Sequence, residues 1–217
     1  MNKNYFIQFY SLFSILSIIL FILPITLGKS KFFSVLLFHL LYILFTYKYQ
    51  LRDWKLLYFF LAPLSFFLVF PDLFLSDFLN VLVFPNFGFF YWISVSDYMA
   101  GMWIIPLFFI YHSGNYISLK YNKFSAPIFS GILAMILFSI SEELCSLIPI
   151  WYAIKVKMIS HIATYVIIPE GILGFSTHWI YEKVKGDIPS SIFGAFLTTM
   201  IYTGSLMFFF YFTEIYF

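Results

Sequence analysis

Two adjacent carboxylates stand in a strongly apolar part of the sequence. Glu142 and Glu143 follow the run "PIFSGILAMILF" and precede a Pro-Ile-Trp step. In a membrane, an ionised carboxylate that faces lipid costs about 3 kcal/mol even on lenient insertion scales, so at least one of the pair should face protein or carry a proton. Neighbouring helical positions point about 100° apart. The pair therefore predicts one inward and one outward glutamate, with Glu142 as the inward one.

A third carboxylate lies in the next apolar stretch, "MISHIATYVIIPEGILGFSTHWIY". Glu170 is near the middle of this stretch, with Pro169 before it and two glycines after it. Proline frees a backbone carbonyl and glycine allows close helix approach, and both are common where a membrane helix lines a cavity. His161 near the start of the stretch is expected to come within reach of Glu142 on the neighbouring antiparallel helix.

These residue types predict acid-base chemistry inside a membrane. A carboxyl group in a dry pocket keeps its proton and can act as a general acid at neutral pH. In this hypothesis Glu170 is the catalytic acid, Glu142 or Glu143 stabilises cationic character, and His161 orients or returns the proton. The substrate would be lipophilic, such as a polyprenoid, a carotenoid or a lipid. Aromatic residues make up 25% of the chain, and their rings stabilise cations.

Less specific interpretations stay open. Ser139 and Glu142 have the spacing of a capping box, which would start a new short helix and leave both glutamates in water. One glutamate would alternatively make a single structural hydrogen bond between helices. For the whole protein, the alternative to an enzyme is a scaffold, sensor or transporter-like protein whose carboxylates are structural or relay protons.

The glutamate pair also resembles a known motif. A Pro-x-Glu-Glu motif occurs in the small membrane-bound carotenoid (lycopene) cyclases, and the resemblance covers four residues, with Ile140 at the position of the family's proline. The resemblance implies protonation of a polyene without a cofactor. The segments "GMWIIPLFF" and "YVIIPEGILGF" are similar to parts of a small, uncharacterised family of multi-pass bacterial membrane proteins.

Patterns for other chemistries are missing from the sequence. It has no H-E-x-x-H motif and no histidine pair at a spacing of three or four. The single Cys145 excludes a cysteine cluster and an intramolecular disulfide. A net charge of +2 without a basic block argues against nucleic acid. We expect no cofactor and no metal, and as partners the lipid bilayer and a lipophilic small molecule.

The composition places these carboxylates in a membrane protein. Of the 217 residues, 62% are hydrophobic and 10% are charged, with a mean hydropathy of +0.93. Soluble domains are about 45–50% apolar. No stretch between the apolar runs is long enough for a core of its own, so we expect one integral membrane domain over residues 1–217.

An all-α bundle of about seven transmembrane helices is predicted, because a span needs about 20 apolar residues. The expected spans are Tyr5–Leu27, Phe32–Tyr47, Leu56–Phe70, Tyr98–Tyr111, Ala126–Ile150, Met158–Tyr181 and Ile192–Phe212. The segment at about 71–97 is apolar but interrupted by Pro, Asn and Gly, so we expect a re-entrant or interfacial element there.

The distribution of basic residues predicts the orientation. Eight Lys and Arg fall on the side of the N-terminus and four on the other side. The eight are Lys3, Lys48, Arg52, Lys55, Lys120, Lys123, Lys183 and Lys185, and the four are Lys29, Lys31, Lys155 and Lys157. The positive-inside rule then predicts a cell (cytoplasmic) membrane protein with its N-terminus in the cytoplasm and its C-terminus outside.

Overall fold

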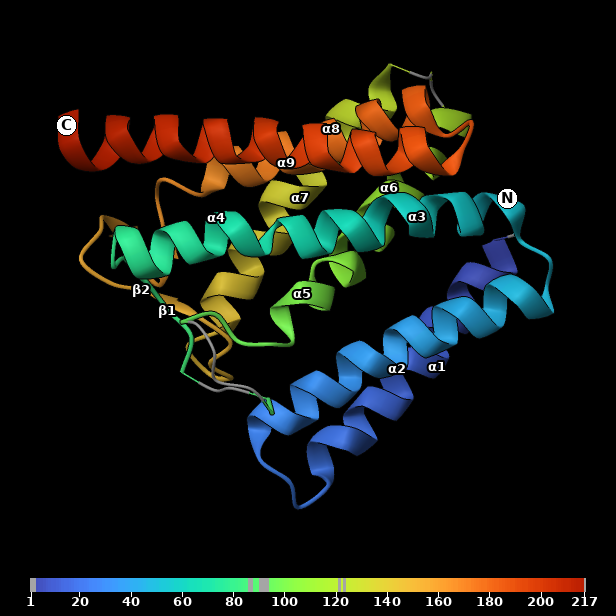
Figure 1. Cartoon of the computed structure of the whole chain (residues 1–217), viewed down its shortest axis with the longest axis horizontal. Coiled ribbons are helices and arrows are strands. Elements are labelled where there is room, and N and C mark those ends of the chain that lie inside the picture. The colour runs from blue at the N-terminus through green and yellow to red at the C-terminus, as the bar shows by residue number, and fades with distance from the viewer. Residues whose placement is uncertain (1–2, 86–87, 90–93, 121, 123, 217) are drawn as a thin grey trace.

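Seven long helices form the body of the protein, as the computed structural model shows (Figure 1). The structure describes residues 3–85, 88–89, 94–120, 122 and 124–216. Within them the long helices are α1 (Lys3–Ile22), α2 (Leu27–Lys48), α3 (Arg52–Phe67), α6 (Ile104–Lys120), α7 (Ser125–Leu144), α8 (Ile167–Val184) and α9 (Ile188–Phe210). The prediction of an all-α helical bundle is confirmed.

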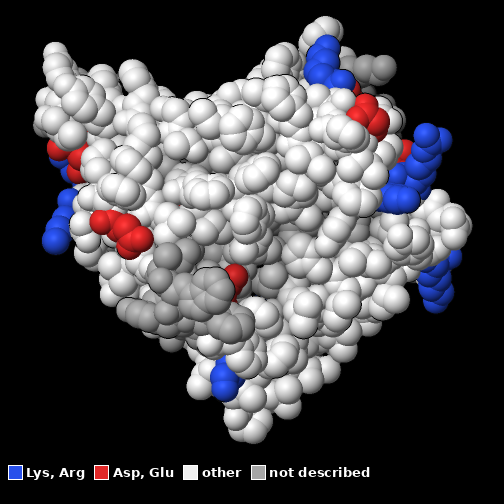
Figure 2. All heavy atoms as spheres, viewed as in Figure 1, with Lys and Arg blue, Asp and Glu red and all other residues white. Residues whose placement is uncertain are grey.

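The helices suit a bilayer. Five of them, counted over the described residues, are long and apolar enough to cross a membrane. The middle of the face shown in Figure 2 is almost free of charge, and most of the Lys and Arg atoms visible on this face lie toward its right-hand end. The N-terminus and the α2–α3 and α8–α9 turns meet at that end in Figure 1. We call it the basic end.

The third helix is longer than predicted. It continues from α3 through α4 (Val69–Leu73) into a π-helical stretch, η1 (Phe74–Phe78), and reaches Phe78 instead of Phe70. Pro71 does not end the helix, because it lies in the first turn of α4, where a missing N–H does no harm. The expected re-entrant element at 71–97 is therefore helical in its first part. It is followed by β1 (Leu82–Val83) and leads to α5 (Met99–Met102), and residues 86–87 and 90–93 lie outside the described residues.

The link between α7 and α8 contains three short strands, two of which lie in a segment that was predicted to be helical. The strands are β2 (Tyr152–Ala153), β3 (Met158–Ile159) and β4 (Ile162–Ala163); β2 pairs with β1, and β3 with β4. Helix α7 therefore ends at Leu144, not at Ile150, and α8 begins at Ile167, not at Met158. Left-handed backbone at Lys155 and Ser160 makes the turns that interrupt this apolar stretch.

Helices α7 and α8 are packed backbone against backbone. A Cβ atom on Gly174 would stand 2.5 Å from the carbonyl oxygen of Ser130, and one on Gly131 would stand 2.9 Å from that of Gly171. Small residues allow such approach between membrane helices. This contact fixes the separation of Glu142 on α7 from Glu170 on α8.

The α1–α2 hairpin is attached to the rest of the bundle by aromatic rings. Phe9 lies edge-on to Phe38 of α2, to Trp54 of α3 and to Phe108 of α6, with centroids 5.1, 5.5 and 5.6 Å away. The Tyr10 hydroxyl donates to the Ile105 carbonyl at 2.8 Å. Helix α1 is thereby held against α3 and α6 near the basic end.

Candidate functional site

Three carboxyl side chains from three helical segments meet at one small cavity. Asp72 comes from α4, Glu142 from the last turn of α7, and Glu170 from the first turn of α8, and all three line a cavity of about 20 Å³. Their exposed fractions are 4, 7 and 3%. A water needs about 10–15 Å³ of such volume, so the cavity has room for about one water. We call this the acid cavity.

Only some of the buried polar atoms at the acid cavity have a hydrogen-bond partner among the described residues. Trp103 Nε1 donates to Asp72 Oδ2 at 3.3 Å, and the backbone N–H of Ala163 donates to Glu142 Oε2 at 3.0 Å. Glu170 Oε2 and the Tyr165 hydroxyl have no hydrogen-bond partner among the described residues. Buried polar atoms are usually paired, so these two mark where a water or a proton belongs.

The acid cavity contains no basic side chain among the described residues that line it. Its other walls are apolar or aromatic, and they come from η1, β1, α5, α9 and the segments that connect these elements. These residues are Leu75, Leu82, Phe84, Met99, Trp103, Trp151, Tyr165, Val166 and Tyr202. Carboxylates that share one buried site repel one another when all are ionised. The arrangement is therefore chemically suited to binding protons.

Glu143 lies outside the acid cavity and pairs with His161. Its Oε1 is 3.0 Å from His161 Nδ1, and it accepts hydrogen bonds from Ser160 Oγ at 2.9 Å and from the His161 backbone N–H at 3.2 Å. The His161 and Glu143 side chains are 59 and 44% exposed, and the pair is ionic only when the imidazole is protonated. The expectation that His161 meets Glu142 or Glu170 is wrong, because His161 lies in the β3–β4 turn and not in a helix.

The β3–β4 hairpin holds both neighbouring glutamates of α7. Its turn, through Ser160 and His161, binds Glu143 on the outside, while Ala163 of β4 binds Glu142 on the inside. The helix runs on to Leu144, so the capping-box interpretation of Ser139 and Glu142 is not what the structure has.

Asp72 is the site residue that sequence reasoning missed. It falls in the segment at about 71–97 that was predicted to be re-entrant or interfacial, because the third span was expected to end at Phe70, before Pro71. A usable signal was present, since Asp72 stands in an apolar run that continues on both sides of it, as Glu170 does. Asp97, at the end of the same segment, accepts from the backbone N–H groups of Gly88 and Phe89 at 3.0 and 2.7 Å and does not line the acid cavity.

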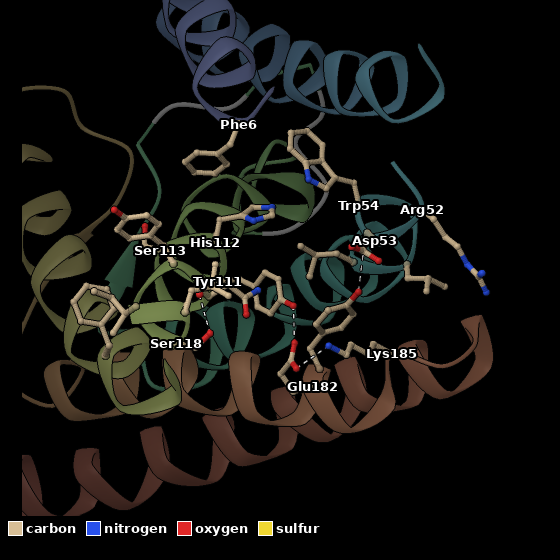
Figure 3. A pocket seen from close by; sticks show the side chains of 18 of the residues that line it. Phe6, Arg52, Asp53, Trp54, Tyr111, His112, Ser113, Ser118, Glu182 and Lys185 are labelled. Atoms are coloured by element: carbon tan, nitrogen blue, oxygen red, sulfur yellow. Dashed lines mark hydrogen bonds and ion pairs between the residues drawn. The ribbon is translucent and has the colours of Figure 1, made fainter. Parts of the chain in front are cut away.

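A polar face of α8 leads from Glu170 toward the basic end. Positions 170, 177, 178, 181 and 185 recur at helical spacing on one face. Thr177 is fully buried without a hydrogen-bond partner among the described residues, and His178 Nδ1 lies 3.0 Å from Ser130 Oγ. At the basic end the Tyr111 hydroxyl donates to Glu182, as Figure 3 also shows. With a rise of about 1.5 Å per residue, Glu170 is about 12 Å along the axis from His178.

Among the described residues, no group of three or more His, Cys, Asp or Glu side chains has a geometry that could hold a metal ion. Residues 69–213 match the model of a domain of unknown function, DUF6989, and this range includes all three acids of the cavity. No curated protein and no solved structure matches the chain.

Proposed function

We propose a function for this chain as a member of the DUF6989 family, to which it belongs: it takes up and passes protons within the membrane at the acid cavity. The observation that carries the proposal is the convergence of Asp72, Glu142 and Glu170 on a space for about one water. Carboxylates inside membrane helices commonly serve proton relays in pumps and transporters.

The size of the acid cavity favours proton transfer over conversion of a lipid. A polyprenoid or carotenoid must place a reacting carbon within about 3.5 Å of the acid. The cavity holds about 20 Å³, which leaves no room for such a chain beside Glu170. A water that bridges Glu170 and the Tyr165 hydroxyl fits the same volume.

The polar face of α8 supports a proton path from the acid cavity toward the basic end. From Glu170 it continues through Thr177 and His178, and Tyr111 and Glu182 follow. On the opposite side Glu142 is bound to the edge of the β3–β4 hairpin, whose turn is exposed. A proton would thus enter beside the hairpin and leave at the basic end, with water filling the gaps.

The orientation that we propose follows the basic residues. The side with eight Lys and Arg faces the cytoplasm, and the side with four faces outward, in the cell membrane. The N-terminus is then cytoplasmic and the C-terminus outside.

Proteoliposomes test the proposed function. Purified protein is reconstituted with a pH-sensitive dye inside, and dye fluorescence is followed after a pH step. The wild type should equilibrate the pH faster than empty vesicles, and Glu170→Gln, which keeps shape and hydrogen bonding, should be no faster than empty vesicles. Glu214→Gln is the matched control, because Glu214, in the π-helical stretch Tyr211–Tyr216 after α9, accepts from the Lys157 backbone N–H and does not line the cavity. Equal rates for Glu170→Gln and the wild type would contradict the proposal.

An acid catalyst acting on a lipophilic substrate is the second candidate. It is favoured by the aromatic walls of Trp103, Trp151 and Tyr202 around the acids, since ring faces stabilise carbocations. Lipid extracts of cells with the wild type and with Glu170→Gln, compared by mass spectrometry, test it. A lipid that changes with Glu170→Gln while proton flux does not would favour the enzyme.

A further inference from the structure

A second and much larger cavity opens at the basic end. Its volume is about 900 Å³, within the range of about 300–1,000 Å³ that is usual for ligand pockets. Helices α1, α3, α6, α7 and α8 contribute to its lining, and Figure 3 shows the side chains of most of these residues. We call it the basic-end pocket. It lies apart from the acid cavity and has no lining residue in common with it.

The inner part of the basic-end pocket is apolar. Its apolar lining includes Phe6 and Ile7 of α1, Leu57 of α3 and Phe129 of α7. At its floor His112 is enclosed by rings, with centroids 4.9 Å from Phe6, 5.6 Å from Trp54 and 4.3 Å from Phe108. Such walls bind a hydrocarbon chain.

The rim of the basic-end pocket carries charge. Lys185 Nζ lies 2.7 Å from Glu182 Oε2, and Glu182 Oε1 accepts from the Tyr111 hydroxyl at 2.7 Å (Figure 3). The Arg52 guanidinium has no hydrogen bond or ion pair to any described residue, and it extends away from the other labelled side chains. Arg52 is therefore the cation at the rim that is available to an anion.

The charge balance of the basic end favours an anion as well. Among the residues whose side chains the structure describes, the α2–α3 and α8–α9 turns and the helix ends beside them hold five Lys and Arg against three acids, Asp53, Glu182 and Asp187. The five are Lys48, Arg52, Lys55, Lys183 and Lys185. An excess of one sign of charge near a cleft raises the local concentration of the opposite sign. Guanidinium groups bind carboxylate and phosphate through paired hydrogen bonds.

We infer that the basic-end pocket binds a single-chain lipophilic acid, with its chain between α1 and α6 and its carboxylate or phosphate head at Arg52. At about 30 Å³ for each water-sized group, the volume takes about 30 non-hydrogen atoms. One chain with its head fits this size. The inference goes beyond proton transfer and does not depend on it.

Photo-crosslinking to the full-length protein in lipid nanodiscs tests the inference. The probes are a diazirine-bearing palmitic acid, the alcohol of the same chain and the phosphate ester of that alcohol, and labelled peptides are mapped by mass spectrometry. The acid or the phosphate should label peptides that contain residues 52–57 and 111–119, and the alcohol should label them about tenfold less, as expected for loss of one charged hydrogen bond. Preference for the acid points to a fatty acid, and preference for the phosphate to an acyl or prenyl phosphate.

Two matched pairs of variants make the test specific. Arg52→Ala should lower labelling by the anionic probe about tenfold, whereas Lys55→Ala removes the same charge from the same helix outside the lining and should leave labelling unchanged. Ile7→Trp should fill the pocket and abolish labelling, whereas Ile15→Trp, on an equally exposed part of α1, should not. Gel filtration establishes that each variant is folded.

Three outcomes overturn the inference: equal labelling by the alcohol, label outside these peptides, or equal loss in Arg52→Ala and Lys55→Ala. Failure of Ile7→Trp to fold leaves the Arg52 and Lys55 pair to decide. Glu170→Gln should bind the probe as the wild type does. Labelling that persists in a protein without proton flux would therefore refute the proposed function and not the pocket.

Discussion

Glu142 and Glu143 are consecutive residues of α7, yet one is buried among carboxyl groups and the other is exposed beside an imidazole. Glu142 accepts a hydrogen bond from Ala163 inside the bundle, and Glu143 binds Ser160 and His161 at the surface. One hairpin, β3–β4, supplies all of these partners. The position of the hairpin therefore decides the surroundings of both glutamates.

Cysteine labelling should separate the two positions. In a Cys145→Ser background, which removes the single, buried cysteine, Glu143→Cys should react with a membrane-impermeant maleimide and Glu142→Cys should not. The reason is that a reagent in water reaches an exposed thiol only. Gel-shift assays on intact cells measure the reaction. Equal rates at both positions would show that position 142 is not buried beside the hairpin.

Reporter fusions should establish the proposed orientation. Fusions after Lys55 and after Lys185 should report the cytoplasm, and fusions at Asp77 and at the C-terminus should report the outside, as the eight-to-four distribution of Lys and Arg predicts. Activities of cytoplasm-specific and exterior-specific reporters give the answer. A cytoplasmic C-terminus would mean an even number of spans and would reverse the direction assigned to the proton path.

Asp72 should matter for stability, and Asp77 should not. Asp72→Ala leaves the buried Trp103 N–H without its acceptor, which costs about 1–3 kcal/mol of unfolding free energy. Asp77→Ala, five residues later on an exposed face, should change it by less than about 0.5 kcal/mol. Unfolding in mixed detergent micelles measures both, and Asp72→Asn, which keeps an acceptor oxygen, should recover most of the loss. Equal effects of Asp72→Ala and Asp77→Ala would show that Asp72 is not a buried hydrogen-bond acceptor at the cavity.

The packing of α7 against α8 should tolerate no added methyl group. Gly174→Ala should destabilise the protein by about 1–3 kcal/mol through overpacking against Ala134 and the Ser130 carbonyl. Gly204→Ala is the matched control, because a Cβ there meets nothing within 4 Å. It should be neutral or stabilising by up to about 1 kcal/mol, since alanine favours helix. The same unfolding assay compares the two, and a loss at Gly204 equal to that at Gly174 would count against close backbone packing as the cause.

Apolar length was enough to predict seven long helices but not where each one begins and ends, as α6 at Ile104–Lys120 against the expected Tyr98–Tyr111 shows. Helical geometry was enough to separate Glu142 from Glu143. Both depend on regular, local repeats. His161 and Asp72 were misplaced for a different reason. Short apolar runs such as Met158–Ala163 fit a strand as well as a helix, and the turn at Ser160 comes from left-handed backbone that its residue type does not require. The location of Asp72 depended on whether Pro71 ends a helix or stands in the first turn of one. Packing decides between these two, and packing cannot be read from a local pattern.

The glycine contacts between α7 and α8 give the acid cavity one rigid side and one deformable side. Helices in backbone contact at Gly131 and Gly174 move as a unit, so Glu142 and Glu170 keep their mutual distance. Asp72 is carried on the third helix, which changes to π-helical winding directly after it, in η1. Short π-helical stretches are often found at functional sites, and their backbone hydrogen bonds depart from the regular α-helical pattern. When the acid cavity gains or loses a proton, the segment that carries Asp72 would therefore move, and the packed pair of helices α7 and α8 would stay in place.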